Sequence, residues 1–265
     1  VKVFSDEEPK SGPFNKLSCL RNERVQLQVA FCADTDCDID VKVQSKLEHI
    51  KVYWVQEIYS KNPVHKLQDS FTLRNKSGYF PELLRPLDGT FKAQAGKWNS
   101  IWLEVIPKTD FAAGEYTINV NFACGEENQA VEFTLDVIDA KLPEQTLINT
   151  NWLHTDCIAT HYKIDVFSEQ YWEYVQNFLQ TAFEHGMNMV LTPLFTPPLD
   201  TKVGAERPTV QLVGVKVTNG EYSFDFSALD RWIEMCDKIG IKYFELSHLF
   251  TQWGAKKCPK IMAEV

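Results

Sequence analysis

The chain has 265 residues, of which 44% are hydrophobic and 24% charged, the composition of a globular protein with one large domain or two ordinary ones. Its formal net charge of −9 excludes nucleic acid and anionic membranes as expected partners, because an acidic surface is repelled by both. No apolar stretch approaches the ~18–20 residues that a membrane-spanning helix needs.

The N-terminal residues and the cysteines indicate which cellular compartment to expect. The first residues, V-K-V-F-S-D-E-E-P, lack the apolar core of a signal peptide. Seven cysteines are dispersed along the chain without a C-x-x-C pair, which favours neither a disulfide framework nor a zinc knuckle. We therefore expect reduced thiols and a cytoplasmic location.

Residues 1–140 are predicted to form an antiparallel β-sandwich. Apolar and polar residues alternate at 25–31, 101–106 and 131–137, the period of two that is typical of half-buried strands. A turn at 113–115 leads into a further strand at 116–122. Short strands at regular spacing, without a helical period, are typical of a sandwich.

Residues 146–265 are predicted to form a second domain, separated from the first by a polar, proline-bearing segment at 141–145. Strands are expected at 147–153, 189–191 and 242–247. Two amphipathic helices are expected between them, one from an N-cap at Ser168 to Gly186 and one closed by Gly240. Alternating strands and helices predict βαβ units with a parallel sheet.

The link between the second strand and the second helix is about thirty residues long, where two to six is usual. It begins with three prolines, which must leave the sheet, and it contains Asn219-Gly220, a strong hairpin signal. Long excursions after parallel strands are often binding loops.

The length of the second domain leaves two alternatives. A closed (β/α)8 barrel takes ~250 residues, about twice the length of the chain after the domain boundary. The segment is either a small open α/β domain or the first part of a TIM barrel, about three βα units. We favour the truncated barrel, because the tail after the third strand has no capping helix.

Several motifs occur in order along the chain. They are S-G-Y-F-P-E-L-L, I-W-L-E-V-I-P and A-A-G-E-Y in the first half, then N-W-L-H-T-D-C-I-A, L-T-P-L-F-T-P-P-L-D-T, G-A-E-R-P-T-V-Q-L-V and F-E-L-S-H-L-F-T-Q-W-G-A in the second. Together they resemble glycoside hydrolase family 123 over essentially the whole chain. The resemblance implies a β-sandwich before a (β/α)8 barrel, and a β-N-acetylgalactosaminidase type of activity on amino-sugar glycans.

The resemblance also implies a retaining, substrate-assisted reaction, in which the 2-acetamido group of the sugar attacks the anomeric carbon. Such enzymes depart from the usual two-carboxylate scheme and need an adjacent Asp-Glu pair. The only Asp-Glu dipeptide here is Asp6-Glu7, which is expected to be a solvated charge run. The catalytic pair is therefore expected beyond Val265, the chain alone is expected to be inactive, and no cofactor is implied.

Ten residues are expected to contact the saccharide, because they follow predicted parallel strands, where ligands of α/β folds are bound. Aromatic faces stack on sugar rings, while carboxylates, hydroxyls and histidines bind sugar hydroxyls. The ten are Trp152, His154 and Asp156 after the first strand, Thr192, Thr196, Asp200 and Arg207 after the second, and Glu245, His248 and Trp253 on or after the third.

Structural roles are the alternative for several of these residues. Trp152 could be a core residue, and Asp200 could pair with Arg207 to brace the loop. Glu245 sits in a strand that should be buried, where an unpaired carboxylate is costly, so it needs a partner, and Arg207 is one candidate.

Metal and thiol chemistry are disfavoured. His154, Asp156, His161 and His248 lack the i, i+4 spacing of a helix-borne zinc site, and His161 is expected in a loop. Cys157 beside His154 forms no convincing nucleophile–base pair.

A non-catalytic carbohydrate-binding or scaffolding protein is the alternative for the whole chain. In either case the expected partner is a glycan or amino sugar. Self-association through an open sheet edge is a further expectation.

Overall fold

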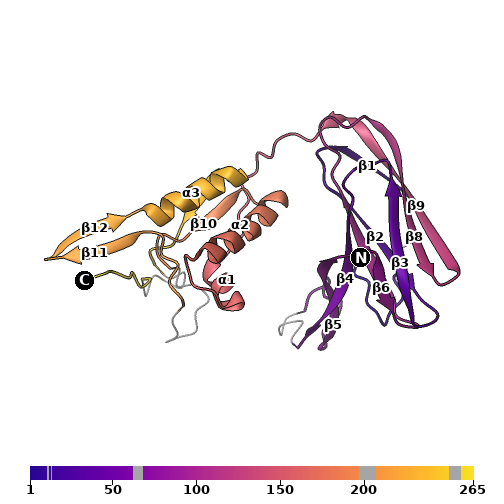
Figure 1. Cartoon of the computed structure of the whole chain (residues 1–265), viewed down its shortest axis with the longest axis horizontal. Coiled ribbons are helices and arrows are strands. Elements are labelled where there is room, and N and C mark those ends of the chain that lie inside the picture. Colours follow the sequence, from indigo (N-terminus) through magenta and orange to yellow (C-terminus); the bar gives the residue numbers. More distant parts are fainter. Residues whose placement is uncertain (11, 13, 62–67, 197–206, 251–257) are drawn as a thin grey trace. The chain divides into compact units, whose positions relative to one another are not determined.

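The computed structural model describes residues 1–10, 12, 14–61, 68–196, 207–250 and 258–265. It divides the chain into two compact units, Val1–Pro143 and Glu144–Val265 (Figure 1). Each unit has a hydrophobic core of its own.

The described part of the first unit contains nine strands in two sheets. The strands are β1 (Lys16–Arg21), β2 (Val25–Cys32), β3 (Cys37–Ser45), β4 (Lys51–Ser60), β5 (Gly78–Pro86), β6 (Thr90–Ala93), β7 (Trp98–Val105), β8 (Gly114–Cys124) and β9 (Glu127–Lys141). One sheet has the order β1-β9-β8-β3-β6 and the other the order β2-β7-β4-β5. The architecture is β-sandwich-like, because the inner faces of both sheets contribute to one core.

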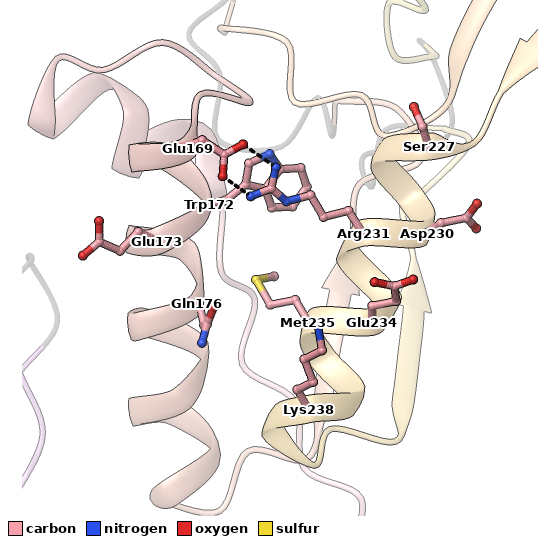
Figure 2. A pocket seen from close by; sticks show the side chains of 10 residues that line it. All are labelled: Glu169, Trp172, Glu173, Gln176, Ser227, Asp230, Arg231, Glu234, Met235 and Lys238. Atoms are coloured by element: carbon pink, nitrogen blue, oxygen red, sulfur yellow. Dashed lines mark hydrogen bonds and ion pairs between the residues drawn. The ribbon is translucent and has the colours of Figure 1, made fainter.

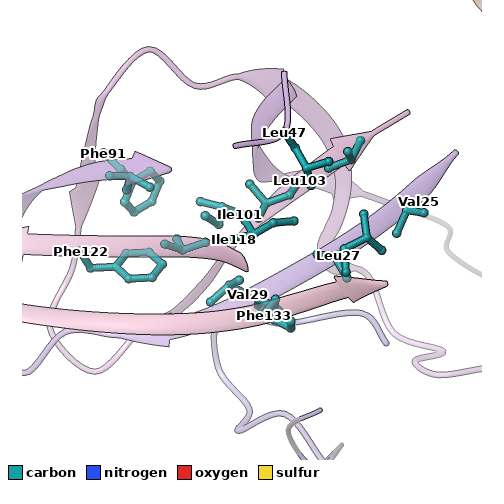
Figure 3. Packing of buried hydrophobic residues seen from close by; sticks show 14 of the residues in the cluster. Val25, Leu27, Val29, Leu47, Phe91, Ile101, Leu103, Ile118, Phe122 and Phe133 are labelled. Carbon is teal, nitrogen blue, oxygen red and sulfur yellow. The ribbon is translucent and has the colours of Figure 1, made fainter. Parts of the chain in front are cut away.

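Period-two alternation explains this core. Figure 3 shows Leu27 of β2, Ile101 and Leu103 of β7, and Ile118 of β8 packed together with Phe133 of β9. Gln26 and Gln28, between the buried positions of β2, point to the other face. Each fully buried aliphatic side chain stabilises the fold by about 1.5–3 kcal/mol relative to exposure.

The predicted strands of this unit are present in β2, β7, β8 and β9, but the sandwich is not purely antiparallel. β1 pairs with β9 in parallel, with Lys16 opposite Thr134. Alternation determines which face of a strand is buried, but it carries no information on the direction of the neighbouring strand. β1 is followed at once by β2 of the other sheet, so β1 finds its own partner far along the chain.

The described part of the second unit is an α/β arrangement. Its elements are α1 (Thr155–Tyr162), α2 (Glu169–Glu184), β10 (Met189–Thr192), β11 (Gly214–Thr218), β12 (Glu221–Asp225), α3 (Ser227–Ile239) and β13 (Tyr243–Leu246). β10 and β13 pair in parallel, with Met189 opposite Tyr243. The three helices and β10 share one hydrophobic core. None of the helices in the described ranges is long and apolar enough to cross a membrane.

The predicted start of α2 and the predicted end of α3 are confirmed. The Ser168 hydroxyl accepts a hydrogen bond from the Tyr171 amide at 3.2 Å, which caps the start of α2. Gly240 ends α3 with a φ of +106°, a conformation that costs glycine little.

The predicted strand at 147–153 is wrong. Only Thr150 makes a bridge, to Met189, and Leu147 and Ile148 are exposed, whereas a strand inside a parallel sheet must be buried on both faces. The helix α1 follows directly and places His161 in a helix rather than the expected loop. The parallel sheet therefore has two strands in the described residues, and a barrel is not evident.

The excursion between β10 and α3 carries the predicted hairpin. Asn219 and Gly220 both have positive φ, at 52° and 83°, as a tight type I′ turn requires. Near the end of the chain, Glu264 extends this hairpin, because its amide donates to the Val215 carbonyl and its carbonyl accepts from the Val217 amide.

Candidate functional site

Three of the predicted site residues form one cluster, which we call the Trp152 cluster (Trp152, Glu245 and His248). The indole Nε1 of Trp152 donates a hydrogen bond to Glu245 Oε2 at 2.9 Å. The Trp152 and His248 rings meet edge to face, with centroids 5.0 Å apart. His248 Nε2 lies 4.0 Å from Glu245 Oε1, so this pair is close but not hydrogen-bonded.

The Trp152 cluster is accessible to a ligand. Trp152 is 43% exposed, and the side chains of His248 and Glu245 are 37% and 24% exposed. Glu245 lies on β13, and His248 follows that strand. The expected pairing of Glu245 with Arg207 is wrong, because the Glu245 carboxylate accepts its hydrogen bond from Trp152.

Arg207 instead forms a buried bridge with Asp156 in the first turn of α1. Arg207 Nε donates to Oδ2 of Asp156 at 2.7 Å, and Nη2 donates to Oδ1 at 2.8 Å. The two side chains are only 13% and 5% exposed. Burial alone would lower the pKa of Arg207, but the Asp156 carboxylate outweighs it and raises that pKa. This geometry is that of a brace between α1 and the segment after β10.

The predicted pairing of Asp200 with Arg207 concerns a residue outside the described ones, as does the predicted contact from Trp253. Within the described residues, Arg207 forms an ion pair with Asp156. Its Nη2 also approaches the Cys157 sulfur at 3.6 Å.

Thr192 and Thr196 are engaged within the protein. Thr192 is buried at the end of β10, and its hydroxyl lies 3.4 Å from the Val190 carbonyl. The Thr196 hydroxyl donates to Thr209 Oγ1 and accepts from the Val210 amide, both at 3.0 Å. Both threonines therefore stabilise the conformation of the chain where it leaves β10.

His154 occupies the N-cap position of α1, and its carbonyl accepts from the Cys157 amide at 3.0 Å. Burial raises the pKa of Tyr171, which packs in the core of this unit, to about 12.

In the portion of the chain that the structure covers, no three His, Cys, Asp or Glu side chains lie close enough to hold a metal ion.

Ser247 is a residue that the sequence did not single out. Its amide donates to the Thr192 carbonyl at 3.1 Å, and its hydroxyl accepts from the Phe195 amide at 3.4 Å. These contacts join the carboxyl ends of β10 and β13. The available signal was its position, at the last residue of a predicted strand and beside His248.

A groove of about 730 Å³ lies elsewhere on this unit, between α2 and α3 (Figure 2). Arg231 crosses it, with bidentate hydrogen bonds of 2.7 and 2.6 Å to Glu169, and its guanidinium lies 4.8 Å from the Trp172 ring centroid. None of the predicted site residues lines this groove. Its exposed ion pair links two helices, and the groove is separate from the Trp152 cluster.

The chain is similar to a known family and to a solved structure. Residues 152–264 match the family model described as glycoside hydrolase 123, catalytic domain. A solved family 123 glycoside hydrolase from Clostridium perfringens, described for glycolipid glycan hydrolysis, is similar with a TM-score of 0.68 and 17% identity. The similarity covers 89% of this chain and 44% of that chain, so the present chain spans less than half of its length.

The similarity to a second solved structure is weak. The CupB2 chaperone of Pseudomonas aeruginosa has a TM-score of 0.26 and 8% identity over 48% of this chain and 55% of its own. The comparison with curated proteins found no match.

Proposed function

We propose that the chain is part of a glycosidase acting on β-linked N-acetylhexosamine glycans, because residues 152–264 match the glycoside hydrolase 123 catalytic-domain model, as the motifs predicted. β10 and β13 would then be neighbouring strands of a TIM barrel, with the Trp152 cluster at their carboxyl ends. The observation that carries the proposal is the contact between the exposed Trp152 and Glu245 of β13, with His248 just after that strand.

The chemistry of the Trp152 cluster suits an amino sugar. The half-exposed indole offers an apolar face to the C–H groups of a sugar ring. Glu245 Oε2 is used by Trp152, while Oε1 is not within hydrogen-bonding distance of His248 and can accept from a sugar hydroxyl or acetamido N–H. In this proposal, Asp156 and Arg207 hold the wall of the site rather than the sugar.

The reaction we infer is retaining and substrate-assisted, with N-acetylgalactosamine as the preferred sugar. It requires an adjacent Asp-Glu pair, and Asp6-Glu7 does not suit that role. Both carboxylates bind Arg74, whose Nη2 lies 2.6 Å from Asp6 and 3.2 Å from Glu7. The 265 residues would therefore supply one wall of the binding site without the catalytic carboxylates.

Binding to this chain tests the site directly. Free N-acetylgalactosamine should shift the Nε1–H resonance of Trp152 in NMR titrations. Trp152→Ala should weaken binding by about tenfold, as expected for loss of one aromatic contact. The matched control is Tyr222→Ala, which removes an exposed aromatic ring from β12. If Trp152→Ala bound N-acetylgalactosamine with unchanged affinity, the Trp152 cluster would not be the sugar-binding site.

Hydrolysis is tested on a protein that contains this sequence and the rest of its barrel. It should release nitrophenol from the β-N-acetylgalactosaminide and be inhibited by a thiazoline analogue of the cyclic intermediate. Turnover that the thiazoline does not inhibit would contradict substrate assistance. Sugar binding without any turnover would favour the alternative, a non-catalytic carbohydrate-binding protein.

A further inference from the structure

Two cysteines of the first unit lie at the ends of neighbouring strands. β3 begins at Cys37, and β8 ends at Cys124. The antiparallel register pairs Val41 with Phe122 and Asp40 with Ala123. Continued by one step, this register sets Cys124 opposite Ile39, and Cys37 becomes its diagonal neighbour.

Both thiols point to the same face. Side chains alternate along a strand, so Cys37 shares the face of the buried Ile39, and Cys124 shares that of the buried Phe122. Both cysteines are partly buried and pack against the sandwich core. The two side chains also contact each other, since a hydrogen bond with Cys124 is the main cause that raises the pKa of Cys37 to about 11.

We propose that Cys37 and Cys124 are a modification site, at which a low-molecular-weight disulfide such as oxidised glutathione converts the two thiols into an intramolecular disulfide. Both residues lie past the last β3–β8 pair, so no β3–β8 pairing has to break for them to approach, although Cys37 pairs with Ala93 of β6 and Cys124 with Glu127 of β9. Diagonal neighbours have Cα atoms about 7–8 Å apart, and a disulfide needs about 4.4–6.8 Å.

The exchange is balanced. One cysteine thiolate attacks the small disulfide, forms a mixed disulfide and releases one small thiolate. The second cysteine thiolate then attacks the protein sulfur of the mixed disulfide, which forms the Sγ–Sγ bond and expels the second small thiolate. Two protein thiols are oxidised, one small disulfide is reduced to two thiols, and two protons pass from the cysteines to the leaving groups.

The bond would join β3 and β8 beyond their last paired residues and close a long loop that contains β4 to β7. Closing such a loop restricts the unfolded chain, so the melting temperature of the first unit should rise by about 5–10 °C. The proposal concerns residues of the first unit alone and does not depend on the proposed glycosidase function.

The test treats the folded full chain with oxidised glutathione at mildly alkaline pH, where more thiolate is present. After the remaining thiols are blocked with an alkylating reagent, proteolysis and mass spectrometry should find the peptides of Cys37 and Cys124 joined. Dithiothreitol should release them and reverse the rise in melting temperature.

The control is Cys32→Ser, which removes an exposed thiol of the same unit and should leave the joined peptides unchanged. Cys124→Ser should abolish both the joined peptides and the rise in melting temperature. Wild-type protein that yields only glutathione adducts, or that joins Cys37 to Cys32, would overturn the assignment. This readout is taken on wild-type chain, so it stands even if a variant folds poorly.

Discussion

The bridge between Asp156 and Arg207 yields the sharpest stability prediction. Asp156→Asn keeps the shape of the side chain and removes the charge that two guanidinium hydrogen bonds of 2.7 and 2.8 Å depend on. Arg207 would then remain as a cation in a site where its side chain is only 13% exposed. Since the bridge joins the first turn of α1 to the segment after β10, the second unit should lose stability.

The size of the loss follows from burial. Breaking a fully buried ion pair by removing one partner costs about 3–5 kcal/mol, because an uncompensated charge is left behind. Arg207 retains some solvent access, so we expect the lower end, about 3 kcal/mol. The double variant Asp156→Leu with Arg207→Met should be less damaging than the sum of its single changes, because both buried charges are removed together.

The assay is urea unfolding followed by helical circular dichroism. All helices of the described residues belong to the second unit, so this signal reports on it. Glu169→Gln is the matched control, because its ion pair with Arg231 is exposed and should contribute only a small fraction of the loss. A loss below about 1 kcal/mol for Asp156→Asn, or strict additivity in the double variant, would refute the reasoning.

Two further variants test the fold. Gly240→Ala should destabilise the second unit by about 2–4 kcal/mol, because φ is +106° and the new Cβ would lie 2.8 Å from Phe183 Cζ. Gly220→Ala, with positive φ but open space around it, should cost only about 1–2 kcal/mol in the same urea-unfolding assay. In the first unit, burial tends to raise the pKa of Glu104, but its hydrogen bonds with Arg24 and Gln26 lower it below the usual 4.5. Its stabilising effect is therefore fully present above about pH 4.5 and lost as pH falls through the folded-state pKa, so Glu104→Gln should flatten the acid limb of melting temperature against pH. An acid limb as steep as that of the wild type would contradict this.

The sequence predicted the long elements well, because the spacing of hydrophobic residues along the chain indicates which side chains are buried. The stripe that begins after Ser168 predicted α2, alternation predicted β2, β7 and β9, and the turn at 113–115 predicted β8. The failure at 147–153 has the same origin. Leu147 and Ile148 are apolar but exposed, so their composition suggested a buried strand that does not form.

The helix α1 was missed because its eight residues are too few to display a helical period. Its start is held by a contact that no local pattern reveals. Asp156 and Arg207 are 51 positions apart, and their pairing depends on how the segment after β10 returns to the start of α1. A short helix stabilised by tertiary contact cannot be read from propensity alone.

The same limit applies to the site. Position at the end of a predicted strand identified Trp152 and His248, although the strand predicted at 147–153 does not form, and the charge inside a predicted strand identified Glu245. It did not identify their partners, and it matched Glu245 with Arg207 by charge alone. The neighbours of Glu245 depend on the register of β13 against β10, which places Glu245 opposite Leu191 and leaves Trp152 within hydrogen-bonding distance.

The exposed side chains of the site can contact a ligand, whereas the buried side chains hold them in position. Trp152 precedes α1 by three residues, so the bridge that holds the start of α1 also limits where the indole can lie. Asp156→Asn should therefore lower sugar affinity together with stability, although Asp156 is nearly inaccessible. Glu245→Leu removes an acceptor that is partly exposed, and it should lower affinity with little loss of stability. NMR titration and urea unfolding of the two variants would contradict this division if both lost affinity and stability in the same proportion.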